Sequence, residues 1–295
     1  MKGERKGDRK TDWFLAVVFL VGAVLFMYPT VSNQWNLFHQ SAAIDGYEEA
    51  VSLMGDSEYG GILEAARDYN EALSGRANRY CLSPEEQKEY EQILNVSGSG
   101  VMGYIEIPKI QVAMPIYHGI SGQVLQTAAG HLPGSSVPVG GPATHCVVTG
   151  HRGLPSARLF TDLDQMEEGD RFFIRILNET LTYEVDRILT VEPENMKGLE
   201  FETGRDYCTL VTCTPYGVNS HRMLVRGHRV SGGEEAADVR VTADAVQIDP
   251  FLAAPMMALP VLLVLFIWQF RGRSGGHVSR RREEPICGGE KDRAD

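Results

Sequence analysis

Two neighbouring stretches of the chain decide how its fold is interpreted. Residues 209–217 have the sequence TLVTCTPYG, and residues 221–229 have the sequence HRMLVRGHR. In the first stretch a β-rich run leads into Cys213, and Pro215 and Gly217 then begin a turn. If the second stretch pairs with the first as an antiparallel strand, Cys213 and Arg222 lie side by side at the end of a sheet.

A histidine follows a third predicted strand. Residues 145–149 form a short β-rich run that ends at Gly150, and His151 comes next. Three strand ends can therefore present a thiol, an imidazole and a guanidinium together. A thiol becomes a better nucleophile beside a cationic neighbour, an imidazole can protonate a leaving amine, and arginine can hold a developing oxyanion.

The other cysteines are interpreted differently. Cys208 lies five positions before Cys213 on the same predicted strand, so its side chain points to the opposite face and is expected in the core. Cys146 is also expected to be a core residue. Four cysteines precede the C-terminal tail and allow two disulfides by count, and no spacing resembles a zinc site.

Among the remaining histidines, His221 is the main rival to His151 because it adjoins Arg222. Alternation along a strand points adjacent side chains to opposite faces, which favours His151. His118 and His131 are expected in loops, where they serve packing or the polarity of a substrate groove.

Two further arginines are given no chemical role. Arg226 shares a strand face with Arg222 but lies farther along, so we expect a structural or peripheral role. Arg152 follows His151 directly and is expected to point to solvent.

The pattern along the chain predicts a mainly β domain. Residues 32–98 are polar with helical spacing, Gly60 and Gly61 separate two helical runs, and Ser83 is the expected cap of a third helix that begins at Pro84. From Val101 onward short β-rich runs are punctuated by Gly and Pro, which is typical of a barrel or sandwich. The predicted strands are 104–107, 114–117, 145–149, 172–177, 180–185, 207–212 and 223–225, with short helices at 124–129 and 159–166.

Two apolar stretches, residues 13–31 and 251–270, contain no charged residue and have about the length needed to cross a bilayer. Basic residues flank both on their outer sides, which predicts that both termini are cytoplasmic and residues 32–250 are outside. A cleaved signal peptide is the alternative for the first stretch.

The net charge of the chain is -11, and the acidic residues are concentrated between the basic tails, which argues against nucleic-acid binding.

These motifs resemble the active-site sequences of the sortase family. TLVTCTPYG followed by HRMLVRG is similar to the strand that carries the sortase cysteine and the next strand, which carries the arginine. VTGHRGLPSARLFTDL at 148–163 is similar to the segment that carries the histidine, and YIEIPKI, MPIYHG and GHLPGSSVPVGG resemble other parts of the family. The best fit is to class C, or pilin-polymerising, sortases.

The resemblance implies a closed sortase β-barrel preceded by a helical extension and flanked by two transmembrane helices. It also implies catalytic roles for Cys213, His151 and Arg222, without a metal or organic cofactor. The expected organisation is a cytoplasmic tail at 1–12, a transmembrane helix at 13–31, a helical extension with a possible lid at 32–98, the catalytic barrel at 99–231, a linker at 232–250, a transmembrane helix at 251–270 and a cytoplasmic tail at 271–295.

The implied reaction is acyl transfer at the membrane. Cys213 would cleave an LPxTG-like sorting signal on a surface or pilin protein, and an amine from a pilin lysine or a cell-wall peptide would resolve the thioacyl enzyme. The alternatives are a sortase that anchors proteins to peptidoglycan, a cysteine peptidase that releases acid, and a catalytically idle membrane-tethered binding module.

One departure from the family concerns the lid. Class C sortases typically carry an Asp-Pro-aromatic motif before the barrel, and residues 32–100 contain no Asp-Pro. The corresponding region is Arg79 to Pro84, which offers Tyr80 and Cys81 but no carboxylate. We expect either a loosely held or redox-responsive lid, or a plain connection between helices. The Asp-Pro-Phe at 249–251 lies after the barrel and is not assigned to a lid.

Overall fold

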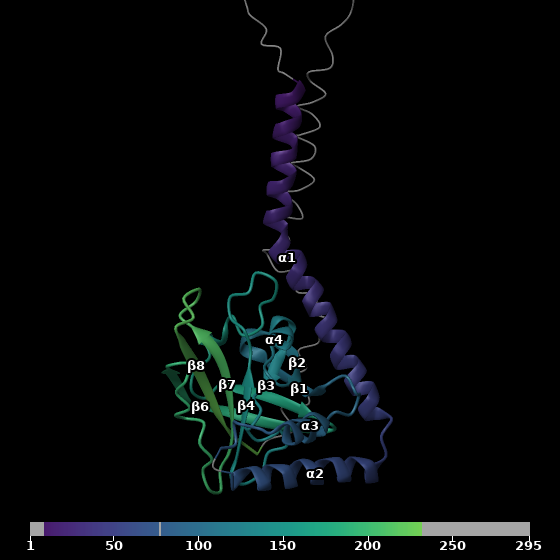
Figure 1. Cartoon of the computed structure of the whole chain (residues 1–295), viewed down its shortest axis with the longest axis vertical. Coiled ribbons are helices and arrows are strands. Elements are labelled where there is room, and N and C mark those ends of the chain that lie inside the picture. Colours follow the sequence, from purple (N-terminus) through teal and green to yellow (C-terminus); the bar gives the residue numbers. More distant parts are fainter. Residues whose placement is uncertain (1–8, 77, 232–295) are drawn as a thin grey trace, which may run out of the picture. The chain divides into compact units, whose positions relative to one another are not determined.

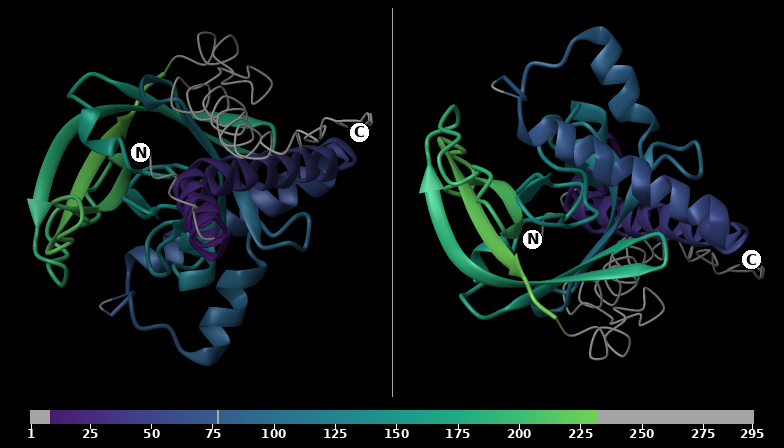
Figure 2. Two further views of the ribbon diagram at one scale, coloured as in Figure 1. Left: turned by 90° about the horizontal axis from the view of Figure 1, so that it is seen from above. Right: turned by 90° about the horizontal axis from the view of Figure 1, so that it is seen from below.

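The computed structural model describes residues 9–76 and 78–231. Within these residues, eight strands close into a barrel in the order β1-β2-β3-β4-β7-β8-β6-β5 (Figures 1 and 2). The strands are β1 (Val101–Ile107), β2 (Val112–His118), β3 (Ala129–His131), β4 (Thr144–Thr149), β5 (Arg171–Ile176), β6 (Glu179–Val191), β7 (Asp206–Thr214) and β8 (His221–Arg229).

The structure confirms the prediction of a mainly β domain. Of the two architectures that the sequence allowed, barrel and sandwich, it is the barrel. Each predicted run lies within a strand or overlaps one, and the strands are generally longer than the runs. Strand β3 was missed, because it is three residues long and contains Gly130, so it shows no alternation. The short helices in this part of the chain are η1 (Pro108–Ile110), α4 (Gly122–Thr127) and η2 (Leu163–Gln165).

Three strands carry the residues of interest. β4 runs parallel to β7, with Cys146 opposite Cys208 and Thr149 opposite Val211. β7 in turn pairs antiparallel with β8. Figure 2 shows β6, β7 and β8 as a strongly curved wall of the barrel.

The barrel interior is a continuous apolar core. Both Cys146 and Cys208 belong to it, at 3% and 0% exposure, as the alternation along their strands predicted. Leu210 and Val148 lie beside them in the same core. Side chains at intervening positions of β4 and β7 therefore face out of the barrel.

Three helices precede the barrel: α1 (Arg9–Ser52), α2 (Asp56–Ser74) and α3 (Pro84–Gln92). The expected break at Gly60 and Gly61 is wrong, because both glycines lie inside α2 and the chain leaves α1 after Ser52. Packing of one face of α2 on the barrel core overrides the low helix propensity of glycine. The predicted start of α3 is confirmed: Ser83 caps it, and the Glu86 side chain completes a capping box.

Helix α1 contains a stretch long and apolar enough to cross a membrane, and none of that stretch is buried. Toward its C-terminal end the helix contacts the barrel: the Tyr47 hydroxyl accepts a hydrogen bond from the Leu177 amide at 2.7 Å, and Tyr104 donates to Glu48 at 2.6 Å. The predicted span at 251–270 and the tail beyond it lie outside the described residues.

Candidate functional site

Cys213 lies near the end of β7, directly opposite Arg222 on β8. The preceding residue, Thr212, points into the barrel and is buried, whereas Cys213 is half-buried on the outer face. The Arg222 guanidinium donates hydrogen bonds to the backbone carbonyls of Asn219 and His221, at 3.2 and 3.1 Å. These bonds hold the arginine side chain over the β7–β8 turn, and the backbone of Arg222 lies directly opposite that of Cys213.

His151 reaches the same end of the barrel because β4 and β7 are parallel neighbours. The Gly150 amide donates to the Val211 carbonyl at 3.0 Å, which continues the strand pairing one residue beyond β4. The Thr212 hydroxyl then donates to the Gly150 carbonyl at 2.8 Å. Gly150 therefore lies beside Thr212 on the neighbouring strand. The residues that follow them, His151 and Cys213, lie at the same level at the ends of the two adjacent strands.

Phe160 fixes the backbone at this point. Its amide donates to the His151 carbonyl at 3.1 Å, and its ring is fully buried against Gly150. A Cβ at position 150 would lie only 2.5 Å from a ring carbon of Phe160. Glycine is therefore required by a close approach, and neither Phe160 nor Thr212 had been identified from the sequence as a support of the site.

The charges around His151 favour its neutral form. Partial burial and then the positive charge of Arg222 lower the pKa of His151 below its ordinary value. His221, the rival histidine, is exposed, lies opposite Thr214 and contacts the Ser220 hydroxyl at 2.9 Å.

The expectation that Arg152 points to solvent is wrong. Its side chain is 8% exposed and forms an ion pair with Asp164. The guanidinium lies 5.9 Å from the centre of the Tyr216 ring, and Gly153 lies against the same ring. Through its contacts with the Asp164 carboxylate and the Tyr216 ring, Arg152 connects the segment after His151 to the turn after Cys213 (residues 215–219).

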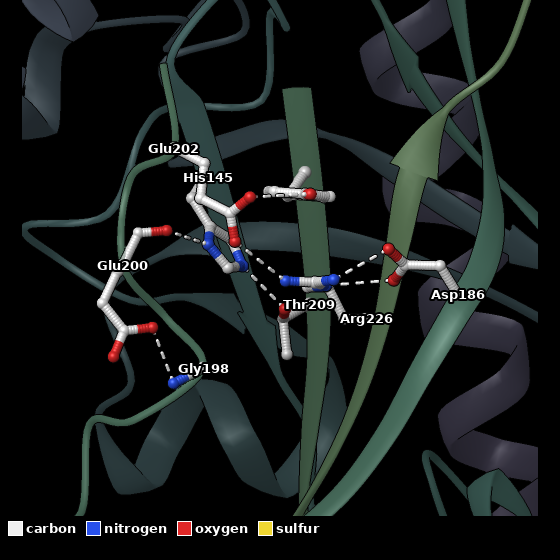
Figure 3. Close-up of polar contacts among 8 residues, drawn as sticks. His145, Asp186, Gly198, Glu200, Glu202, Thr209 and Arg226 are labelled. Atoms are coloured by element: carbon white, nitrogen blue, oxygen red, sulfur yellow. Dashed lines mark hydrogen bonds and ion pairs between the residues drawn. The ribbon is translucent and has the colours of Figure 1, made fainter. Parts of the chain in front are cut away.

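Arg226 has a structural role, as its position on β8 predicted. It forms two hydrogen bonds with Asp186, at 3.0 and 2.8 Å, and an ion pair with Glu202 at 3.4 Å (Figure 3). Its guanidinium also lies 4.1 Å from the centre of the Tyr207 ring. The Asp186 and Glu202 carboxylates balance the positive charge of Arg226. Arg226 thereby joins β8 to β6 and to the segment before β7.

His145 belongs to the same polar network (Figure 3). Its Nδ1 lies 2.8 Å from the Glu200 carbonyl and its Nε2 lies 2.7 Å from the Thr209 hydroxyl. A carbonyl accepts only, so Nδ1 carries the proton and Nε2 accepts from Thr209. Burial lowers the pKa of His145 to about 4, which makes it a neutral structural residue at pH 7.

The part of α1 that directly follows residues 13–31 holds the segment that follows His151. Asn33 accepts a hydrogen bond from the Arg158 amide at 2.9 Å, and Asn36 donates to the Ser156 carbonyl at 2.7 Å. The helical extension thus supports residues 153–158, which the sequence alone did not indicate.

The segment that the sequence offered as a possible lid, residues 79–84, contacts the rest of the domain through Arg79. The guanidinium donates to the Leu199 carbonyl at 2.7 Å and lies 3.7 Å from the centre of the Phe201 ring. A Cβ on Gly134 would be 2.2 Å from the Arg79 carbonyl oxygen, so the backbones are also close. Cys81 is an exposed free thiol.

His118 and His131 lie on strands and not in loops. His131 is fully buried in β3, where it contacts the Tyr90 hydroxyl at 2.9 Å and the Ser136 carbonyl at 2.8 Å. His118 ends β2 and contacts the carbonyls of Gly100 and Ile93. Both therefore serve packing, one of the two roles that the sequence suggested.

Comparison with known proteins gives consistent results. Residues 105–230 match the family described as the sortase domain. Sortase C1 of Streptococcus agalactiae is 49% identical, with a TM-score of 0.63, over 65% of this chain and 99% of that structure. Sortase C of Streptococcus pneumoniae is 41% identical over 65% of this chain and 97% of that structure, with a TM-score of 0.57. Sortase C-1 of Actinomyces oris is 45% identical over 59% and 99%, with a TM-score of 0.54.

Among curated proteins, sortase A of Streptococcus agalactiae is 29% identical over 137 residues, which is 45% of this chain and 55% of that protein. The chain therefore matches only about half of that relative's length. The barrel and these similarities define a cysteine transpeptidase fold. The chain belongs to the sortase family, and its solved relatives at 40–49% identity include class C sortases.

Proposed function

We propose that the chain is a membrane-anchored transpeptidase that cleaves an LPxTG-like sorting signal at Cys213 and transfers the acyl group to a pilin lysine. The single observation that carries this proposal is the pairing of Cys213 with Arg222 at the strand end beside Gly150 and His151. A thiol, a guanidinium and an imidazole on adjacent strand ends are the groups that acyl transfer through a thioester requires.

The proposed reaction has two halves. In the first, the Cys213 sulfur attacks the carbonyl carbon of the scissile peptide bond after its proton passes to His151. Arg222 donates hydrogen bonds to the oxyanion, the carbon–nitrogen bond breaks, and His151 returns the proton to the leaving amine. In the second, the acceptor amine attacks the carbonyl carbon of the thioester and gives a proton to His151, the carbon–sulfur bond breaks, and His151 returns that proton to the Cys213 thiolate.

The environment of His151 supports its use as a base in the first step. Partial burial and Arg222 lower its pKa, so the imidazole is neutral at pH 7 and able to take the thiol proton. The imidazolium so formed is then the acid that protonates the leaving amine. No metal or organic cofactor takes part in this scheme.

Transfer to a pilin lysine, not to peptidoglycan, is favoured by the relatives. Sortase C structures are 36–49% identical to this chain. Sortase A of Streptococcus agalactiae is 29% identical, and sortase A of Corynebacterium diphtheriae is 41% identical. Sortase C of Streptococcus pneumoniae has a pilin substrate specificity. Anchoring of surface proteins to the cell wall is the second candidate, because sortase A proteins share the catalytic region.

Product analysis tests the proposal. The chain is incubated with an LPxTG peptide alone, with a lysine-containing pilin peptide, or with a cell-wall stem peptide. An amide to the pilin lysine is the expected product. Amide only to the stem peptide supports the anchoring function, release of acid even with excess amine identifies a peptidase, and no cleavage in any arm identifies an idle binding module.

The proposed topology has both termini in the cytoplasm and residues 32–250 outside. The apolar stretch of α1 supports one anchor. The single cysteine of the C-terminal tail, Cys287, lies outside the described residues and provides the test. Protection of Cys287 from an impermeant thiol reagent in intact cells is expected, and labelling would contradict two spans.

A further inference from the structure

Two cysteines that the proposed reaction does not use lie opposite each other inside the barrel. Cys146 on β4 and Cys208 on β7 are paired positions of adjacent parallel strands. Both are buried, at 3% and 0% exposure, and both are free thiols in the structure. The two side chains are near enough to influence each other's pKa. Each thiol therefore has the other as its immediate partner.

We propose that Cys146 and Cys208 form a disulfide in the exported protein and that this bond joins β4 covalently to β7. Adjacent strands lie about 4.8 Å apart, and this spacing falls within the range of roughly 4.4–6.8 Å between the Cα atoms of disulfide-bonded cysteines. The other two cysteines of the described residues are unsuitable partners: Cys81 is exposed, and Cys213 faces out of the barrel.

The chemistry is a two-electron oxidation. Two S–H bonds break and one S–S bond forms, and the two electrons and two protons pass to a small-molecule or protein disulfide outside the membrane, which becomes two thiols. Because both sulfurs are buried, the exchange takes place before the barrel closes. Extracytoplasmic proteins are the ones in which such bonds form and persist.

The bond has a direct consequence for the strand ends. Cys146 lies five residues before His151, and Cys208 lies five residues before Cys213. A covalent link at the paired positions fixes the parallel register of β4 and β7, and thus the level at which the imidazole and the thiol leave the sheet. This consequence rests on the proposed catalytic function, and the existence of the bond rests on the proposed placement of residues 32–250 outside the membrane.

The test uses the full chain exported in cells. Free thiols are blocked with an alkylating reagent at harvest, and the chain is digested without reduction and analysed by mass spectrometry. The expected result is a linked peptide pair that contains Cys146 and Cys208, with Cys81 and Cys213 alkylated. Alkylation of both Cys146 and Cys208 in the denatured, unreduced chain overturns the proposal, as does linkage of either one to Cys81 or Cys213.

A second measurement needs no catalytic activity. The bond closes a long loop, so thermal unfolding under reducing conditions is expected about 10 °C lower than under oxidising conditions. The variant Cys81→Ser serves as a matched control and should keep this difference. The double variant Cys146→Ala with Cys208→Ala should unfold at the same temperature with and without reductant. A wild-type chain without such a difference overturns the proposal.

Discussion

The substitution Gly150→Ala probes how the strand end positions His151. A Cβ at this position would lie 2.5, 2.9 and 3.1 Å from three carbons of the Phe160 ring, where ordinary contacts begin at 3.4 Å. The ring is fully buried and cannot retreat freely. The backbone must therefore shift by about 1 Å, which costs roughly 1–3 kcal/mol of stability by overpacking and about a hundredfold in rate if a catalytic group is misplaced by that distance.

The assay is thioester formation with an LPxTG peptide, together with chemical unfolding of the same preparations. Gly122→Ala is the matched control, because a Cβ there meets nothing within 4 Å. Adding Phe160→Leu to the Gly150→Ala variant removes ring atoms and should restore part of the rate. The expected loss of rate is about a hundredfold. A folded Gly150→Ala variant that reacts within roughly twofold of the wild type would therefore show that the contact between Gly150 and Phe160 does not position His151.

Three further predictions concern residues around the site. Thr212→Val leaves the buried Gly150 carbonyl without its hydroxyl donor, so we expect a stability loss of about 1–3 kcal/mol in urea unfolding; an unchanged midpoint would contradict the contact. The pKa of His145 is about 4 in the folded chain and near 6.5 when unfolded, so the unfolded state takes up the proton first and stability falls as the pH drops from 7 to 4, by up to about 3 kcal/mol from this group. His145→Gln should flatten that dependence, and parallel curves would count against it. Arg79→Ala removes the contacts with Leu199 and Phe201 and should lower stability while leaving the rate of thioester formation unchanged; a faster reaction would instead assign a gating role to residues 79–84.

The sequence predicted the strand ends well because their determinants are local. A β-rich run that stops at glycine or proline identifies its own end, as at Gly150 and Pro215. The alternation along β7 separated the core residue Cys208 from the half-buried Cys213 without knowledge of the partner strands.

The wrong predictions concern positions whose structure depends on contacts with other parts of the chain. The helix break assigned to Gly60 and Gly61 was wrong because the tertiary packing of α2 compensates for glycine. Arg152 was misassigned because the two residues that cover it, Asp164 and Tyr216, come from η2 and from the turn between β7 and β8.

The polar network around His145 was missed for the same reason. Its acceptor and its hydroxyl donor, Glu200 and Thr209, lie more than fifty residues further along the chain. The composition of a strand does not indicate which backbone carbonyl will face a buried imidazole.

The central claim is that Cys213 is the nucleophile, supported by His151 and Arg222. The most direct measurement is labelling of the chain with a thiol-reactive analogue of the LPxTG sorting signal, followed by mass spectrometry of the modified peptide. We predict an adduct on Cys213, abolished in Cys213→Ala, nearly lost in His151→Ala and slowed by roughly 10²–10³ in Arg222→Ala. An adduct on Cys81, Cys146 or Cys208 with none on Cys213 would contradict it.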